Sequence, residues 1–121
     1  MLVSQFLTII FIGFGGMIGT ISRYLVSLVV SQQILAIFII NVFGCLIAGF
    51  CYVYFPPKLL KQVFLIGFCG GFTTFSTFAM QNYQLIIDNN FTILFLYIFS
   101  SVIFAIIGFY LGIRLGSMFL N

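Results

Sequence analysis

Hydrophobic residues fill four long segments of the chain, and short stretches of polar residues, proline and charge separate them. The segments cover about residues 5–30, 33–55, 61–87 and 91–119. Each is long enough for the roughly 20 apolar residues that an α-helix needs to cross the hydrocarbon core of a bilayer. Because the connections are short, consecutive helices must run in opposite directions. We therefore predict an all-α membrane protein whose four transmembrane helices form one up-down-up-down domain over residues 1–121.

The third segment carries the most unusual stretch, residues 67–78, which reads Gly-Phe-Cys-Gly-Gly-Phe-Thr-Thr-Phe-Ser-Thr-Phe. Its glycines and hydroxyl residues predict an interruption of the helix near its middle. Backbone groups freed by a break must be buried in protein or line a cavity, where their carbonyls can bind a cation. Beyond the break, Phe75 and Phe78 are three residues apart and share one face of a resumed helix. This combination predicts an ion-handling site.

Polar residues in the other three segments each allow two interpretations. Arg23 either extends its charge to the membrane interface or has a structural or vestibule role, since a charge within a span is costly. Asn41 either bonds neighbouring helices together or offers its amide donor to an anion. Tyr97 and Ser101 either form a hydroxyl ladder beside an ion path or serve as an interfacial anchor and a helix-packing serine.

Composition supports a membrane protein and excludes several other classes. The 121 residues are 64% hydrophobic and 4% charged, whereas soluble domains carry about 25% charged residues. With no histidine and a single acidic residue, Asp88, the chain has no plausible acid–base pair, triad or metalloenzyme site, so we do not expect an enzyme. Four scattered basic residues are too few to bind nucleic acid. The three cysteines are interpreted as apolar packing residues rather than disulfides or metal ligands: Cys45, Cys51 and Cys69.

The basic residues favour one orientation in the membrane only weakly. Lys58, Lys61 and Arg114 fall on one side of the predicted bundle, whereas Arg23 and Asp88 fall toward the other. Because positive charge collects on the cytoplasmic side, both termini are expected there. A bias this small is also compatible with insertion in both directions and antiparallel pairing.

The polar residues of the four segments together predict an anion path. Every polar member can donate a hydrogen bond, and no acidic residue is available to line the path. An aromatic ring has a positive edge, so a phenylalanine presented edge-on attracts an anion weakly. Such a lining suits a small, hard anion that must lose water without being trapped. The carbonyls of the break suit a cation instead, so we predict an anion path organised around a buried cation.

Residues 67–78 resemble the signature of the Fluc (CrcB) family of small fluoride channels. The core Gly-Gly-x-Thr-Thr-Phe-Ser-Thr-Phe is highly specific to that family. The resemblance covers essentially the whole chain, because the length, the four spans and the positions of four polar residues also correspond: Arg23, Asn41, Tyr97 and Ser101.

The resemblance implies a fluoride-selective channel that passively exports cytoplasmic fluoride across the plasma membrane of a bacterium. It also implies an antiparallel, dual-topology dimer with two pores, formed with a second copy of the chain or with a paralogous subunit. By the same resemblance, Phe75 and Phe78 present their ring edges to fluoride and Asn41 donates to it. Four hydroxyl residues then continue the polar track: Ser76, Thr77, Tyr97 and Ser101.

A central Na⁺ that is structural and not transported is the one cofactor that the resemblance implies. The main-chain carbonyls of Gly70 and Thr73 would hold it across the two-fold axis, and Arg23 would be structural or lie at a vestibule. Two positions depart from the family pattern: Gln81 stands where many members have glutamate, and Ala105 where some keep a hydroxyl. These departures concern the pore mouth and the polar track, and they do not change the expected ion.

Two other functions fit the general shape of the sequence. A small multidrug exporter also has four helices, but proton-coupled export of cationic drugs needs a carboxylate within the membrane. This chain has none inside a span. A membrane assembly subunit without transport of its own is the second alternative. The broken helix argues against it, because a scaffold gains nothing from exposed carbonyls.

Overall fold

The computed structural model describes residues 1–56 and 58–120, and the regular elements in these two ranges are all helices. Three spans are single helices: α1 (Leu2–Val29), α2 (Gln33–Tyr54) and α6 (Phe91–Met118). The third span consists of α3 (Leu59–Gln62), the π-helix η1 (Val63–Cys69), α4 (Gly70–Phe72) and α5 (Phe75–Ile87). All four spans are long and apolar enough to cross a membrane. The predicted all-helical fold with four spans is confirmed.

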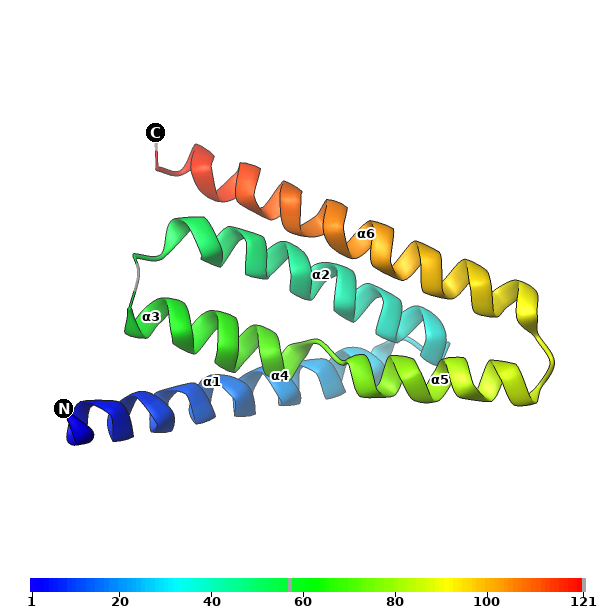
Figure 1. Cartoon of the computed structure of the whole chain (residues 1–121), viewed down its shortest axis with the longest axis horizontal. Helices are drawn as coiled ribbons and strands as arrows, with labels where there is room; N and C mark the ends of the chain where they lie inside the picture. The colour runs from blue at the N-terminus through cyan, green and yellow to red at the C-terminus, as the bar shows by residue number, and fades with distance from the viewer. Residues whose placement is uncertain (57, 121) are drawn as a thin grey trace.

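Consecutive spans run in opposite directions, as the short connections require. The start of α1 and the end of α6 therefore lie at the same end of the bundle (Figure 1). The first span begins at Leu2 and the third at Leu59, each a few residues before the predicted start. The ends of α1 and α5, together with the starts of α2 and α6, form the opposite end of the bundle.

Glycines bring the helices together as two close pairs, α1 against η1 and α4, and α2 against α6 (Figure 1). In the first pair, a Cβ atom added at Gly15 would lie 2.6 Å from the carbonyl oxygen of Val63. In the second, a Cβ atom at Gly108 would lie 2.9 Å from the carbonyl oxygen of Val42. Small residues at interfaces are how helices approach in lipid. The GxxxG spacing of Gly15 and Gly19 therefore allows α1 to approach the third span closely.

The break in the third span lies at Thr73 and Thr74, whose backbones are extended between α4 and α5. The predicted interruption near the middle of this span is confirmed, but it is narrower than expected. Gly67, Gly70 and Gly71 remain helical, so the expectation that they interrupt the helix is wrong. Gly67 serves packing instead, because a Cβ atom there would lie 2.6 Å from a carbonyl oxygen of α1.

Apolar side chains cover the outside of the bundle as well as its interior. Phe14, Leu96 and Phe99 are each more than half exposed, whereas Ile40 and Phe72 are buried between the helices. A helix bundle that is apolar on every face is stable when lipid, rather than water, surrounds it. The chain is a multi-pass membrane protein.

Candidate functional site

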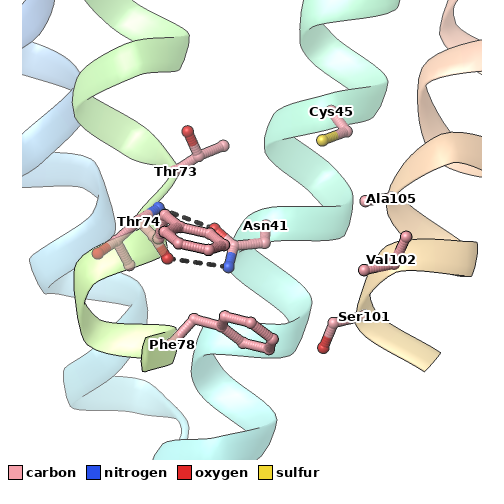
Figure 2. Close-up of a pocket in the computed structure, with 9 residues that line it drawn as sticks. Asn41, Cys45, Thr73, Thr74, Phe78, Ser101, Val102 and Ala105 are labelled. Carbon is pink, nitrogen blue, oxygen red and sulfur yellow. Dashed lines mark hydrogen bonds between the residues drawn. The ribbon is translucent and has the colours of Figure 1, made fainter. Parts of the chain in front are cut away.

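Two hydrogen bonds between α2 and the third span stabilise the break. The Thr74 backbone N–H donates to Oδ1 of Asn41 over 2.8 Å, and Nδ2 of Asn41 donates to the Thr74 carbonyl over 3.1 Å (Figure 2). These are backbone groups that a continuous helix would have paired internally. Since an Asn amide has two N–H donors, one remains for another partner. Asn41 therefore bonds two helices and still offers a donor beside the break.

Thr74 also starts α5. Its Oγ1 accepts from the Thr77 backbone N–H over 3.1 Å, which caps the new helix, and Oγ1 donates to Oγ1 of Thr77 over 3.0 Å. The Ser76 hydroxyl lies 3.3 Å from the same oxygen. A threonine cap satisfies a backbone donor that the break leaves without a helical partner. The hydroxyls of Ser76 and Thr77 are thus gathered around Thr74.

A hollow of about 240 Å³ opens beside the break, between α2, α5 and α6 (Figure 2). We call it the phenylalanine hollow. It brings together four of the predicted path residues, Asn41, Phe75, Phe78 and Ser101, and its full lining also includes Cys45, Thr73, Thr74, Val102 and Ala105.

One hydroxyl in this hollow has no partner. Ser101 is buried, and its Oγ forms no hydrogen bond with any residue of the ranges 1–56 and 58–120. Buried hydroxyls are normally paired, because an unpaired polar group costs roughly 1–3 kcal/mol. The Ser101 side chain is therefore free to bind a ligand or water that enters the hollow.

The two phenylalanines of the break differ in their surroundings. Phe75 is 80% exposed, whereas Phe78 is partly buried against Ile37, Ile40 and Phe72. Their ring centroids are 5.7 Å apart. The ring of Phe75 therefore bounds the phenylalanine hollow on one side, and the rest of the single chain leaves this ring uncovered.

Tyr97 does not line the phenylalanine hollow, but it contacts Phe78, which does. Its ring meets Phe78 edge-on, with centroids 4.9 Å apart and an interplanar angle of 60°. Its hydroxyl donates to Oε1 of Gln81 over 2.7 Å, and Nε2 of Gln81 donates to the Gln33 carbonyl over 3.0 Å. Gln81 thus connects α6, α5 and the start of α2.

Arg23 and Thr77 lie apart from the phenylalanine hollow. They line a second hollow of about 380 Å³, called here the Arg23 hollow, together with Thr20, Tyr24, Ser27, Gln33 and Ile37. Within residues 1–56 and 58–120, no carboxylate forms an ion pair with this guanidinium. The hollow thus contains a fixed positive charge, which suits an anion. Two of its hydroxyls already donate to carbonyls, Thr20 to Gly71 over 3.4 Å and Ser27 to Tyr24 over 2.6 Å.

The carbonyls predicted to hold a cation are available at the break. Gly70 is exposed, and the described part of the chain gives neither its carbonyl oxygen nor that of Thr73 a hydrogen-bond donor. Unwound carbonyls are suitable ligands for Na⁺. One chain supplies only these two, so a cation there would need ligands from elsewhere. The described residues contain no cluster of His, Cys, Asp or Glu that could hold a metal.

Sequence reasoning missed two important residues of the site. Thr74 is the centre of the hydrogen bonds at the break, and its position three residues before Thr77 at the start of a helix is a capping signal that could have found it. Cys45 lines the phenylalanine hollow one helical turn after Asn41, so the spacing of four could have found it as well.

Known proteins resemble the chain over most of its length. The family described as "CrcB-like protein, Camphor Resistance (CrcB)" matches residues 10–113. A protein of Flavobacterium psychrophilum named fluoride-specific ion channel FluC is 36% identical over 116 residues, which cover 88% of this chain and 94% of the relative. Fluoride-specific ion channel FluC 1 of Listeria monocytogenes is 35% identical over 113 residues, covering 88% and 95%. The chain therefore belongs to the CrcB-like family.

Proposed function

We propose that this chain is a fluoride-selective ion channel. The observation that carries the proposal is the phenylalanine hollow, where a free Ser101 hydroxyl and the Asn41 amide lie beside the rings of Phe75 and Phe78. Membership of the CrcB-like family, with relatives named fluoride-specific ion channels, supports the same function. These relatives are named ion channels, and the chain is not an enzyme.

The lining of the hollow supports an anion over a cation. Its donors are neutral, so they can replace the water around an anion without holding it as tightly as a fixed positive charge would. Ring edges add a weak attraction and exclude water. No carboxylate repels the ion, because the only acidic residue of the sequence, Asp88, follows α5. The absence of a membrane carboxylate also argues against proton-coupled drug export.

Within this proposal, fluoride passes the ring edges of Phe75 and Phe78, where Asn41 and Ser101 donate to it in place of water. Tyr97 continues the path beyond Phe78. Ser76 and Thr77 support the break through Thr74, and Arg23 attracts the anion from a vestibule. The channel would act in the plasma membrane of a bacterium, where it lets fluoride leave the cytoplasm down its gradient.

The proposal includes a second subunit. Phe75 is 80% exposed and Gly70 is also exposed, so a single chain leaves part of the break uncovered. An antiparallel second copy, or a paralogous subunit, would cover this part and enclose the path. Two breaks that meet would also bring together four carbonyls, from Gly70 and Thr73 of each chain. These carbonyls would hold a structural Na⁺, which keeps the two breaks aligned.

Ion release from liposomes tests the function directly. The purified protein is reconstituted, the liposomes are loaded with potassium fluoride or potassium chloride, and valinomycin sets the voltage. We expect fast fluoride release, measured with an ion-selective electrode, and no chloride release. Equal release of both ions would contradict selectivity. Release of neither ion, from folded protein with or without a paralogous subunit, would contradict a channel.

A further inference from the structure

The side chain of Gln81 joins three helices, α2, α5 and α6. Its Oε1 accepts from the Tyr97 hydroxyl over 2.7 Å, and its Nε2 donates to the Gln33 carbonyl over 3.0 Å. Tyr97 contacts Phe78, which lines the phenylalanine hollow, and Gln33 lines the Arg23 hollow. A continuous chain of contacts thus runs from one hollow to the other through Gln81.

The hydrogen bond with Gln81 occupies the only proton that Tyr97 can donate. A tyrosine hydroxyl has a single O–H donor, and a neutral amide oxygen is one of its ordinary acceptors. Tyr97 is buried, so water cannot readily replace a lost partner. An anion that reaches Tyr97 therefore competes with Gln81 for the same proton.

We propose that Gln81 is a positioning residue that works as a latch on Tyr97. It holds the ring edge-on against Phe78 and keeps the hydroxyl proton away from the passing anion. The proposal rests on the proposed fluoride channel and assigns Gln81 a role in setting how tightly the path holds its ion.

The latch makes the interaction of the ion with Tyr97 reversible. An O–H bond to an anion is charge-assisted and roughly twice as strong as a bond between neutral groups. If the hydroxyl were free, the ion would be held at this point and would leave slowly. When the ion must first displace Gln81, its hydrogen bond with Tyr97 leaves the Gln81 amide oxygen without a donor. The cost of that unpaired oxygen offsets part of the free energy that the ion gains from Tyr97. Conduction requires binding that is weak enough for the ion to leave.

A simpler role for Gln81 is an inert brace that only joins α5 to α6 and α2. A brace and a latch predict different changes in ion affinity when Gln81 is replaced. Loss of a brace loosens α5 against α2 and α6 and frees the ring of Tyr97, so the ion is bound more weakly or equally well. Loss of a latch frees the Tyr97 hydroxyl, so the ion is bound more tightly, and only while that hydroxyl is present.

The test is a double-mutant cycle of Gln81→Met and Tyr97→Phe in the liposome assay, with the rate of release measured against fluoride concentration. Methionine has a similar length to glutamine but lacks the amide oxygen that accepts from Tyr97 and the N–H that donates to Gln33, and its thioether sulfur is only a weak acceptor. For Gln81→Met we expect the half-saturating fluoride concentration to fall about fivefold, the change that one ordinary hydrogen bond produces, and the maximal rate to fall as well. In the Tyr97→Phe background the same substitution should leave the half-saturating concentration unchanged.

The matched control is Gln84→Met. Gln84 is exposed, donates to Oδ1 of Asp88 over 3.1 Å and lines neither hollow. The half-saturating fluoride concentration of Gln84→Met should therefore equal that of the wild type. Should Gln81→Met not assemble, Gln81→Ala gives the same comparison. An unchanged or raised half-saturating concentration, or an equal change in both backgrounds, would overturn the latch while leaving the channel intact. A wild-type protein that releases no fluoride would overturn the proposed function and the latch together.

Discussion

Asn41 binds both backbone groups of Thr74, the N–H over 2.8 Å and the carbonyl over 3.1 Å, although the two residues are 33 positions apart in the sequence. A single side chain thus compensates for the interrupted helix on the side that faces α2. Asn41 also lines the phenylalanine hollow, and its amide has a second N–H beyond the one that Thr74 accepts. The same residue therefore stabilises the break and contributes a donor to the proposed path.

Replacing Asn41 should reduce stability and fluoride release together. In Asn41→Leu, both hydrogen bonds to Thr74 are lost, and its backbone groups are left unpaired in a site with little water. We expect the variant to lose roughly 2–4 kcal/mol of stability. The measurement is the midpoint of thermal unfolding in detergent, and liposome assays of folded protein should show little fluoride release. Gln84→Leu, which removes an exposed amide, is the control; equal midpoints for the two variants would contradict this role of Asn41.

Ser101→Ala separates function from stability. The Ser101 hydroxyl has no partner within the described residues, so its removal breaks no protein hydrogen bond and should leave the unfolding midpoint unchanged or slightly raised. If the hydroxyl donates to the ion, however, the rate of fluoride release should fall about tenfold.

The adjacent Ser100 provides a matched control. Its hydroxyl donates to the Tyr97 carbonyl of its own helix over 3.3 Å, and it lies outside the phenylalanine hollow. We expect Ser100→Ala to release fluoride at the wild-type rate. Equal rates for Ser100→Ala and Ser101→Ala would show that Ser101 is not a ligand on the path.

Phe75→Ile and Phe78→Ile should both abolish fluoride release, because isoleucine is apolar but offers no ring edge to an anion. The two substitutions should differ in stability. Phe75 is 80% exposed in the single chain, so Phe75→Ile removes little packing. Phe78→Ile removes the contact between the Phe78 and Tyr97 rings, so this variant should unfold at a lower temperature. Phe99→Ile, on the outer face of α6, is the control for both. Wild-type release by the two variants would rule out the ring-edge mechanism.

The sequence was sufficient for the spans and the approximate place of the break, because both depend on local composition. Runs of apolar residues determine where the spans lie. Hydroxyl side chains that compete with the backbone hydrogen bonds of a helix determine where the third span is interrupted. The glycines of the same stretch were misinterpreted, since glycine can equally loosen a helix or let a neighbouring helix approach. Only the position of α1 beside Gly67 distinguishes these two roles.

The arrangement of the site was harder to predict, because it depends on which helix faces are turned toward one another. Ser76 and Thr77 belong to the same motif as Phe75 and Phe78, yet their hydroxyls gather around Thr74. Thr77 also lines the hollow of Arg23 rather than that of the phenylalanines. The two interpretations of Asn41, a bond between helices and a donor for an anion, use the same amide. The structure supports the first and leaves a donor for the second.

The close approach of α1 to the third span gives a last prediction from two glycines of one helix. A Cβ atom at Gly19 would overlap the carbonyl oxygen of Phe68, whereas a Cβ atom at Gly13 would have nothing within 4 Å. Gly19→Ala must therefore push α1 away from η1 and α4, at a cost of about 1–3 kcal/mol or more. Gly13→Ala introduces the same methyl group without a clash and should be neutral or slightly stabilising, since alanine favours a helix over glycine. Unfolding midpoints in detergent compare the two directly. A Gly19→Ala variant as stable as Gly13→Ala would mean that α1 does not pack on the broken span through this face.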